Sequence, residues 1–494
     1  MVTSGAYASQ GIDEFINNSV QPITTVFSSM VFFSVPLLGA DVPLVVVWLI
    51  CAAVYFTLYF KFVNIRGFTH ALRLVRGDYA NPSDPGEVTH FQALATAVSG
   101  TVGIGNIGGV AVAISVGGPG ATLWMIIAGL LGMSTKFIEC TLGTMYRREN
   151  EDGSVSGGPM YYLEHGFAAR GMKKFGKIIG RFYALGIVIG CLGIGNMFQS
   201  NQAFKQFVSV TGGADGSWFA DKGWLFGTVL GILVGAVILG GIKSIARVTS
   251  KVVPFMALFY CTSAIIIIGM NYEAIPFAID AIVSGAFSAQ GMSGGAIGVM
   301  IVGFQRAMFS NEAGIGSAPI AHAAVRTEQP VTEGYVSLLE PFIDTVVICT
   351  MTALVIVTTF YYDPGFNEGL DGIEMTSAAF ERNISWSPYL IAVAGMLFAF
   401  STMIAWAYYG LKGWTYLVGE GHWASAGFKL VFCLFVALGC SIQLGAVLEF
   451  SDAMVFLICV PNIIGLYMLA PVVRRELHRY DRNFSRAGEP VRDE

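Results

Sequence analysis

The sequence predicts an all-α polytopic membrane protein with eleven transmembrane helices. Hydrophobic residues make up 54% of the 494-residue chain and charged residues 12%, against about 25% charged residues in soluble proteins. Long apolar runs alternate with polar segments, and most runs approach or exceed the roughly 20 residues that a helix needs to cross a bilayer. Two of these runs are interrupted by clusters of glycine, which favours helices that break within the membrane.

The chain divides into an N-terminal segment, one extra span, two sets of five spans and a tail. Residues 1–41 are expected to form an interfacial helix on the outer side, because apolar residues recur there at near-helical spacing. The extra transmembrane helix is expected at residues 42–63, and the cytoplasmic tail at residues 473–494. The other ten spans are expected at residues 89–116, 120–146, 179–204, 223–242, 250–271, 293–323, 334–361, 387–412, 424–442 and 443–472.

The charges of the loops indicate the orientation of the chain. With the first residues outside, 23 of the 28 Lys and Arg residues fall in the inward loops, at the inward ends of spans or in the tail, as the positive-inside rule requires. The N-terminus is therefore expected outside and the C-terminus in the cytoplasm. No Lys or Arg precedes Lys61, so a cleaved signal peptide is not expected.

The two glycine-rich breaks begin two halves of five spans each. Val102-Gly103-Ile104-Gly105-Asn106 is echoed 211 positions later by Ala313-Gly314-Ile315-Gly316-Ser317. Because five is odd, residues 89–271 and 293–472 must insert with opposite orientation, as the halves of an inverted repeat do. Corresponding glycine-interrupted spans in two halves predict the binding site of a secondary transporter.

A broken helix exposes two kinds of backbone group. Amides at the start of its second half attract an anion, and carbonyls at the end of its first half attract a cation. At the first break, the candidate anion donors are the amides of Ile104 and Gly105, and the candidate cation ligands are the carbonyls of Ser99 and Val102. An amino-acid zwitterion with Na+ satisfies both. The alternative is that the glycines only allow close helix packing.

Polar side chains near the first break are candidates to complete the site. Thr101 supplies a hydroxyl and Asn106 an amide at the depth of the break. Gln199 and Gln202 end the predicted span 179–204, where an amide could bind the substrate or simply form a polar helix end.

A second set of candidates lies in the predicted span 387–412. Ser401 and Thr402 place adjacent hydroxyls at mid-span, and such oxygens can complete a Na+ shell begun by carbonyls. Trp406, about one turn further on, could wall a small pocket or contribute only to packing.

Four charged side chains at membrane depth are candidates for gating or coupling, because charges there are costly. Arg306 and Glu312, near the second break, are expected to pair with each other, to line water, or to form a structural ion pair. Glu340 and Asp344, four residues apart, are expected to face one environment, as a proton relay or as structural residues.

Other features of the sequence give weaker evidence about function. Lys136 and Glu139 are expected to snorkel or to pair. The run Gly103–Gly108 matches GxGxxG but lies in an apolar helix rather than after a strand, so no organic cofactor is expected. A net charge of −5 gives little support for nucleic-acid binding. Scattered histidines and the lack of an HExxH motif argue against an intramembrane enzyme.

Four ordered motifs resemble the alanine or glycine:cation symporter family, which is usually sodium-coupled. The similarity extends over about residues 42–472. The motifs are SGTVGIGN at Ser99–Asn106, GGPMYY at Gly157–Tyr162, FSNEAGIGSAP at Phe309–Pro319 and WAYYG at Trp406–Gly410.

The resemblance implies a LeuT-type core of two inverted five-helix repeats, with an amino acid bound between the two broken helices. It also implies a prokaryotic inner membrane, which makes the outer side the periplasm. A Na+ site is implied between the first break and the Ser401–Thr402 segment, with carbonyl ligands from Ser99 and Val102. The residues implied around the substrate are Thr101, Gly105, Asn106, Gln199 in preference to Gln202, Phe309 and Trp406.

The function expected from these features is Na+-coupled import of a small neutral amino acid, alanine or glycine, by alternating access. The alternatives are a glutamine-selective symporter and a proton-coupled symporter, for which Glu340 and Asp344 would matter. An ion channel could also use exposed carbonyls, but no repeated filter loop is present. The expected partners are the amino acid and the lipid bilayer, and the sequence does not predict an oligomeric state.

Overall fold

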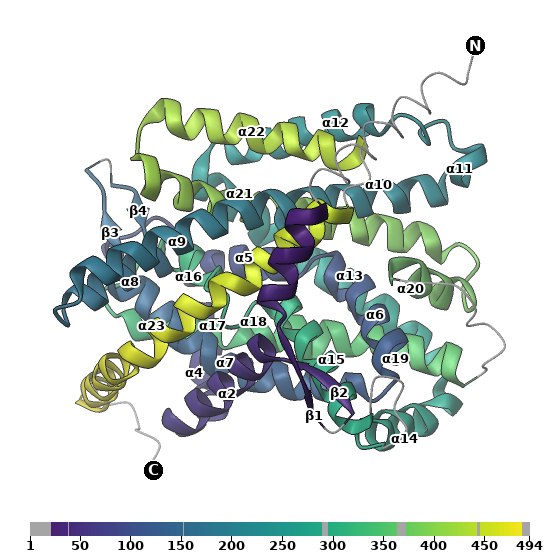
Figure 1. Ribbon diagram of the computed structural model, residues 1–494, viewed down its shortest axis with the longest axis horizontal. Helices are drawn as coiled ribbons and strands as arrows, with labels where there is room; N and C mark the ends of the chain where they lie inside the picture. Colours follow the sequence, from purple (N-terminus) through teal and green to yellow (C-terminus); the bar gives the residue numbers. More distant parts are fainter. Residues whose placement is uncertain are drawn as a thin grey trace.

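The computed structural model describes residues 21–486, except residues 38, 152, 289–294, 363–371 and 442–444. Most of the described chain is helical (Figure 1). The prediction for residues 1–41 lies partly outside the described residues, and residues 21–31 are helical. A short antiparallel hairpin follows, made of β1 (Ser34–Leu37) and β2 (Ala40–Pro43).

One long helix precedes the two predicted halves. This helix, α2 (Leu44–Tyr59), lies within the predicted extra span, and the short helices α3 (Val63–Arg66) and α4 (Phe68–Arg76) follow it. The elements of the first half are α5 (His90–Thr101), η1 (Ile104–Asn106), α6 (Gly108–Gly117), α7 (Ala121–Met145), β3 (Arg148–Glu149), β4 (Val155–Ser156), α8 (Pro159–Ala168), α9 (Lys173–Leu192), η2 (Gly193–Phe198), α10 (Gln199–Val210), α11 (Gly213–Gly216), α12 (Gly223–Ile238), α13 (Gly241–Met270), η3 (Tyr272–Ala274) and α14 (Ile275–Ala286).

The second half ends in a helix that continues beyond the predicted last span. Helix α23 (Gly445–Arg486) extends into the predicted tail, with Pro461 and Pro471 inside it. The preceding elements are α15 (Gly295–Asn311), α16 (Ala318–His322), α17 (Pro330–Ser337), α18 (Leu339–Pro341), η4 (Phe342–Cys349), α19 (Thr350–Ile356), η5 (Val357–Tyr361), α20 (Gly372–Glu381), α21 (Ser387–Val418) and α22 (His422–Ser441).

The helices agree with a multi-pass membrane protein. Among the described residues, seven helical stretches are long and apolar enough to cross a membrane, and the bent pair α5 and η1–α6 gives an eighth. The shorter apolar helices α2 and α12 coincide with two more predicted spans, and α15 with α16 coincides with the predicted span 293–323. A mostly helical membrane architecture is confirmed, and the count of eleven spans stays a prediction.

The two broken spans lie against each other. The first bends by 63° between α5 and the η1–α6 part. The second changes direction through Glu312, Gly314 and Gly316, whose φ angles are 57°, 95° and 86°. Helix α5 packs on α16, and α6 packs on α15. Pairing the first half of one broken span with the second half of the other is the arrangement expected of inverted repeats.

Among the described residues, three π-helical segments interrupt the long spans. They are η2, η4 and η5. The wider turn of a π-helix shifts the faces that the following residues present, and such segments often occur at functional sites. Segment η2 leads directly to Gln199, and η4 carries Asp344 and packs on η1 at the first break. The sequence analysis did not predict these segments.

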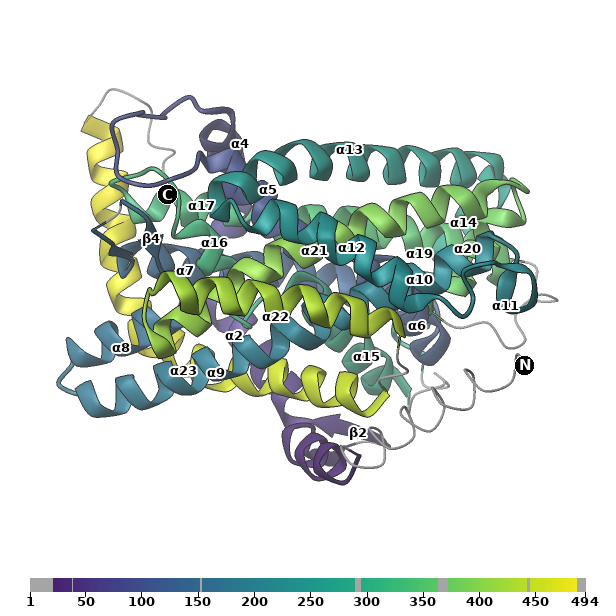
Figure 2. The ribbon, with the colours of Figure 1, turned by 90° about the horizontal axis from the view of Figure 1, so that it is seen from above.

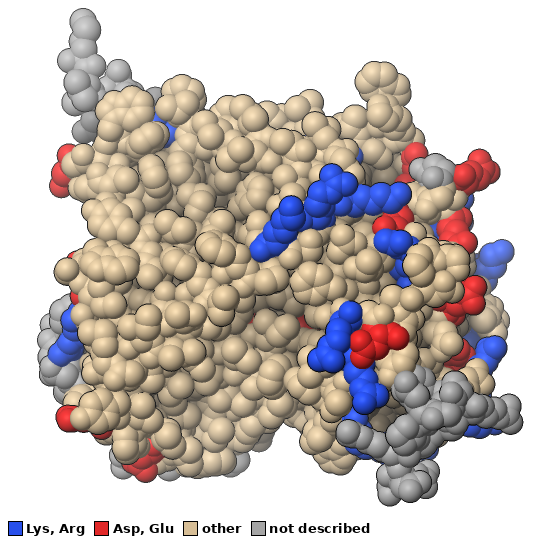
Figure 3. Space-filling view, turned by 180° about the vertical axis from the view of Figure 1, so that it is seen from behind, with Lys and Arg blue, Asp and Glu red and all other residues tan. Residues whose placement is uncertain are grey.

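The outer surface fits a lipid environment over a wide belt. In Figure 3, most charged side chains gather toward one end of the face shown, a few lie along the opposite edge, and a broad uncharged region lies between them. Figure 2 shows α13, α21 and α22 running alongside one another in the direction across this belt. Large apolar side chains of α12 and α13, such as Ile232 and Leu258, are exposed, as lipid-facing residues are.

Close packing of α12 on α22 gives a prediction for stability. A Cβ atom at Gly227 would lie 2.7 Å from the Ala437 Cα atom, so Gly227→Ala is expected to destabilise the protein by about 1–3 kcal/mol through overpacking. Gly269→Ala in α13 is the matched control, because a Cβ atom there meets no atom within 4 Å. Thermal unfolding in detergent measures both variants. Equal stability of the two would contradict the described packing of α12 on α22.

Candidate functional site

At the first break, side chains replace part of the α-helical backbone bonding. In an unbroken helix the Gly103 amide would bond to the Ser99 carbonyl; here it donates to Asn106 Oδ1 at 2.8 Å. A Cβ atom at Gly103 would lie 2.8 Å from Thr402 Oγ1 and 3.2 Å from Gln199 Oε1. Only glycine therefore allows both side chains to approach the break this closely.

The four residues predicted to hold Na+ lie together at this break. Thr402 Oγ1 donates to the Val102 carbonyl at 3.4 Å, and Ser99 Oγ donates to the Ser401 carbonyl at 2.5 Å. All four residues are buried. Their oxygens are carbonyls and hydroxyls, and hard oxygen donors of this kind suit small hard cations. The oxygen types therefore suit the predicted ion. In the second pair, the groups that meet are the Ser99 hydroxyl and the Ser401 carbonyl, and the Ser401 hydroxyl donates to the Phe398 carbonyl at 3.0 Å.

On the other side of the break, Gln199 is the glutamine that reaches the backbone. Its Oε1 accepts from the Ile104 amide at 3.3 Å, and its Nε2 donates to the Ile194 carbonyl in η2 at 3.3 Å. Gln202 instead donates to Asn201. The Ile104 amide, predicted as an anion donor, thus has a protein partner. Gly105 differs, because a Cβ atom there would meet no atom within 4 Å, so open space adjoins it.

Asn106 connects the two broken spans. Its Nδ2 donates to Asp344 Oδ1 at 2.5 Å and to Ser310 Oγ at 3.1 Å. Thr352 Oγ1 donates to the Asn106 carbonyl at 2.8 Å. Since Oδ1 caps Gly103, both ends of the Asn106 amide are engaged by the protein. The side chain therefore positions the break rather than pointing free toward a ligand.

Trp406 closes one wall of the site. The indole is 1% exposed, and Nε1 donates to the Gly100 carbonyl at 3.2 Å. A Cβ atom at Gly195 in η2 would lie 2.3 Å from Trp406 Cγ, so the ring lies flush against the π-helix. Thr101 is also buried, and its hydroxyl donates to the Val98 carbonyl at 3.2 Å.

The second break is fixed from three directions. Asn462 in α23 donates to the Gly314 carbonyl at 2.8 Å, and Tyr183 in α9 donates to the Ile315 carbonyl at 3.0 Å. The Ser317 hydroxyl donates to the Glu312 carboxyl. Glu312 also has a left-handed backbone, which costs a non-glycine residue roughly 1–2 kcal/mol. Such strain is typical of functional positions.

The other charged candidates occupy different places. Arg306 and Phe309 line a cavity of about 140 Å³ together with Glu449 and Asp452. Phe309, predicted around the substrate, thus lies partly buried on the α15 side of the second break. One of the expectations was an ion pair between Glu312 and Arg306. The contact found for the Glu312 carboxyl is a hydrogen bond from the Ser317 hydroxyl.

The carboxyls of Glu340 and Asp344 do not share partners. Lys136 Nζ bonds to Glu340 Oε1 at 2.8 Å. Asp344 accepts from Asn106 at the first break, from Ser310 and from Thr345. The π-helical segment η4 starts between the two residues. Their spacing of four therefore does not give them the common partners that it suggests in a regular α-helix. Lys136 and Glu139 are both fully buried, so snorkelling is wrong. Pairing is confirmed for Lys136, with Glu340 as its partner, and not for Glu139 among the described residues.

Comparison with known proteins identifies the family of the chain. The model of the sodium:alanine symporter family matches residues 26–494. The chain belongs to this family. The sodium/alanine symporter AgcS of Methanococcus maripaludis is 37% identical over 441 residues, which cover 89% of this chain and 94% of AgcS. The probable sodium/glutamine symporter GlnT of Bacillus subtilis is 32% identical over 450 residues, 91% of this chain and 90% of GlnT.

A solved structure shows the fold. The crystal structure of MhsT in complex with L-phenylalanine aligns with a TM-score of 0.55 at 15% identity, covering 76% of this chain and 88% of MhsT. MhsT has the LeuT-type fold, so that prediction is confirmed for the core. Family membership also confirms that this sodium:alanine symporter homologue is a transporter and not an enzyme.

In this symporter, the start of α5 and the end of α16 are joined through their backbones. Val88 and Val325 form a parallel β-bridge, and the Arg326 amide donates to the Val88 carbonyl at 2.8 Å. Burial lowers the pKa of the Arg147 guanidinium, while Glu149, Glu333 and Asp84 oppose that shift. Arg147 donates to four carbonyls of these two segments, those of Pro85, Ala323, Val325 and Thr327.

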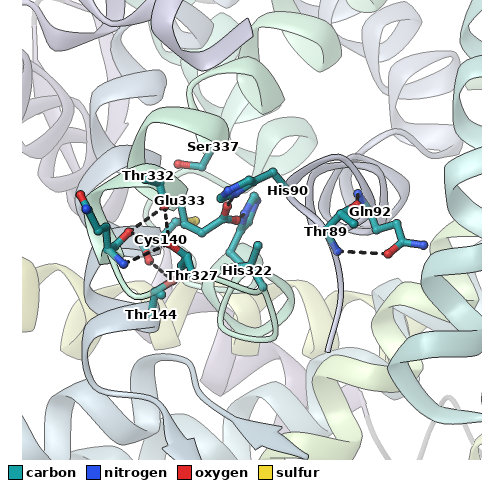
Figure 4. Close-up of polar contacts among 12 residues, drawn as sticks. Thr89, His90, Gln92, Cys140, Thr144, His322, Thr327, Thr332, Glu333 and Ser337 are labelled. Carbon is teal, nitrogen blue, oxygen red and sulfur yellow. Dashed lines mark hydrogen bonds and ion pairs between the residues drawn. The ribbon is translucent and has the colours of Figure 1, made fainter. Parts of the chain in front are cut away.

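A buried cluster reinforces the same junction. His90 begins α5, His322 ends α16, and Glu333 lies in the first turn of α17. Figure 4 shows both imidazoles directed at the Glu333 carboxylate, and each Nδ1 bonds to one of its oxygens. We call these three residues the His-Glu-His clamp. The sequence analysis missed it, because the histidines are far apart in the chain and no local motif marks them.

The tight approach at Gly103 gives a prediction. Gly103→Ala is expected to displace Thr402 and Gln199 and to lower Na+-dependent alanine uptake by about tenfold or more, equivalent to about 1.4 kcal/mol. Gly109→Ala is the control, because a Cβ atom there meets no atom within 4 Å. Proteoliposome uptake and thermal unfolding are measured for both. A Gly103→Ala variant that transports like Gly109→Ala would show that the break tolerates the methyl group.

Proposed function

We propose that this protein is a Na+-coupled importer of a small neutral amino acid, alanine or glycine, working by alternating access. The observation that carries the proposal is the first break. Oxygens of Ser99, Val102, Ser401 and Thr402 gather on one side of it, and open space adjoins Gly105 on the other. A cation and a carboxylate are the two ligands that the ends of a broken helix attract.

Each group at the break has a role in this proposal. The carbonyls of Ser99 and Val102 and the hydroxyls of Ser401 and Thr402 ligate Na+. The amide of Gly105 and the Thr101 hydroxyl receive the substrate carboxylate. The remaining wall residues are Gln199, which also engages the Ile104 amide, Asn106, which holds the geometry, Phe309 and Trp406.

Coupling follows from the shared break. Na+ fixes the carbonyl end of α5 and the amino acid fixes the amide end of α6, so each ligand stabilises the backbone that the other needs. The relatives support the choice of substrate. AgcS is named for alanine and GlnT for glutamine, and the indole of Trp406 packed against η2 favours the smaller substrate.

The membrane arrangement completes the proposal. Eleven spans place the N-terminus in the periplasm and the C-terminus in the cytoplasm of a prokaryotic inner membrane. The two five-helix repeats then put the His-Glu-His clamp on the cytoplasmic side and the Arg306 cavity on the periplasmic side. Alternating access moves the pair of broken helices against the surrounding spans.

Thr402 provides the direct test of the Na+ site. Thr402→Ala is expected to raise the Na+ concentration for half-maximal alanine uptake by about tenfold, because a lost ligand costs roughly 1.4 kcal/mol. Thr415→Ala is the matched control on the same helix, because its buried hydroxyl bonds only to the Lys412 carbonyl of α21 among the described contacts. Proteoliposomes with an imposed Na+ gradient give both values.

Two results would overturn the assignment. Uptake that ignores Na+ and follows a pH gradient would exclude Na+ coupling. Equal Na+ dependence in the two threonine variants would exclude Thr402 as a ligand. Competition by D-alanine, L-alanine, glycine, serine and glutamine decides the substrate, and strongest competition by glutamine would favour the GlnT-like alternative.

The β-bridge between Val88 and Val325 tests how the broken helices move. In a variant without the eight native cysteines, V88C and V325C are expected to form a disulfide, because β-bridge partners lie within disulfide reach. Joint movement of α5 and α16 predicts that oxidation leaves alanine uptake within about twofold of the reduced protein. Loss of uptake on oxidation, restored by reductant, would show that α5 swings away from α16.

A further inference from the structure

A group of four charged side chains lies behind the second break. Lys136 and Glu139 come from α7, Glu312 from the break itself and Glu340 from α18. Lys136, Glu139 and Glu340 are 0% exposed and Glu312 is 4% exposed. All three carboxyls lie within electrostatic range of the Lys136 ammonium. We call these four residues the buried charge group.

The three carboxyls have unequal partners. Glu340 forms the ion pair with Lys136. Glu139 Oε1 accepts from Asn462 Nδ2 at 2.6 Å, while its Oε2 has no hydrogen-bond partner among the described residues. Glu312 accepts from the Ser317 hydroxyl. Neither Glu139 nor Glu312 forms an ion pair in the described part of the chain.

Asp344 shows what a buried carboxylate requires. Hydrogen bonds from Asn106, Ser310 and Thr345 reach its two oxygens at 2.5–2.8 Å. Three donors replace much of the water that a charged carboxylate loses on burial. Glu139 and Glu312 each accept from one side-chain donor among the described residues, with the Gly314 backbone also close to Glu139. The protein therefore does not solvate a charge on either of them to the same degree.

The charges of the group do not balance when every carboxyl is ionised. Lys136 neutralises Glu340, which leaves two negative charges in a space closed to water. An uncompensated ion in a protein interior costs several kcal/mol. Na+ does not fit here, because it would lie beside the Lys136 ammonium, and no metal-binding cluster is found among the described residues. A proton on each remaining carboxyl removes the imbalance without a new ligand.

We propose that Glu139 and Glu312 form a proton-binding site at the second break, loaded in the described conformation. Each carboxylate takes one proton from bulk water and becomes a neutral carboxylic acid, and releases it to water when the break opens. Beyond Lys136, Glu340 and Asp344, the titratable groups that face these two carboxyls are neutral phenols and thiols. They are Tyr162, Tyr183, Tyr409, Cys140 and Cys459.

Glu312 links this site to movement. Its backbone holds the left-handed turn of the break, and its carboxyl bonds to Ser317 on the other side of that turn. A neutral Glu312 fits the closed break, whereas an ionised one favours a break that admits water. Acidic conditions therefore favour the closed state and alkaline conditions disfavour it. This consequence rests on the proposed transport function; the proton-binding site does not.

Infrared spectroscopy tests proton binding without transport. At neutral pH the purified protein is expected to show carbonyl stretching bands of protonated carboxylic acids. Glu139→Gln and Glu312→Gln are each expected to remove one band, since Gln keeps the acceptor oxygen but has no carboxylic acid. Glu149→Gln, at an exposed position, is the control. Bands unchanged in both buried variants, with normal unfolding temperatures, would overturn the proposal.

Alanine exchange between equal Na+ concentrations tests the link to movement. Exchange by the native protein is expected to fall at least tenfold from neutral to strongly alkaline pH, while Glu312→Gln loses less than twofold, because its side chain stays neutral. Glu149→Gln should follow the native profile. The same alkaline loss in Glu312→Gln, or a folded Glu312→Gln that exchanges at no pH, would overturn the role of the proton. If the protein moves no alanine, the infrared result still decides the site.

Discussion

An unpaired backbone group in an apolar interior costs several kcal/mol, and this constraint shapes the structure around both breaks. Asn106 and Trp406 bond to backbone groups freed at the first break. Asn462 and Tyr183 do the same at the second. Trp406, Asn462 and Tyr183 come from other spans, so helices that surround a break also complete its hydrogen bonds. The residues that pack the spans together therefore also shape the site.

The two breaks are joined by hydrogen bonds as well as by packing. Asn106 at the first break and Ser310 at the end of α15 both donate to Asp344 in η4. A shift of either break therefore changes the partners of the other. Because Asn106 Oδ1 also caps Gly103, the connection reaches the backbone on which Na+ and substrate are proposed to bind. The Asp344 carboxylate then gives a specific route for coupling between the halves. Its oxygens already accept three hydrogen bonds, so it does not serve as a ligand itself.

The features that could be predicted from the sequence are those marked by residues close together in the chain. Glycine clusters located both breaks, and adjacent hydroxyls at Ser401 and Thr402 located the partner of the first. Run length located the long apolar helices that the structure describes. The π-helical segments were not predictable in this way, because no residue type marks them. The His-Glu-His clamp was also missed, since His90 and Glu333 are 243 positions apart and become neighbours only when the two halves fold together.

The carboxyls show most clearly where reasoning from the sequence ends. Glu340 and Asp344, four residues apart in an apolar run, looked like a relay, but a buried carboxyl is governed by its donors rather than by its spacing. Lys136 balances the charge of Glu340, whose Oε2 has no hydrogen-bond partner among the described residues, and three neutral donors satisfy Asp344. Glu139 and Glu312 have fewer hydrogen-bond donors than Asp344, and they are therefore the carboxyls proposed to bind protons. In a membrane interior, the number of donors around each carboxyl decides whether it can keep its charge.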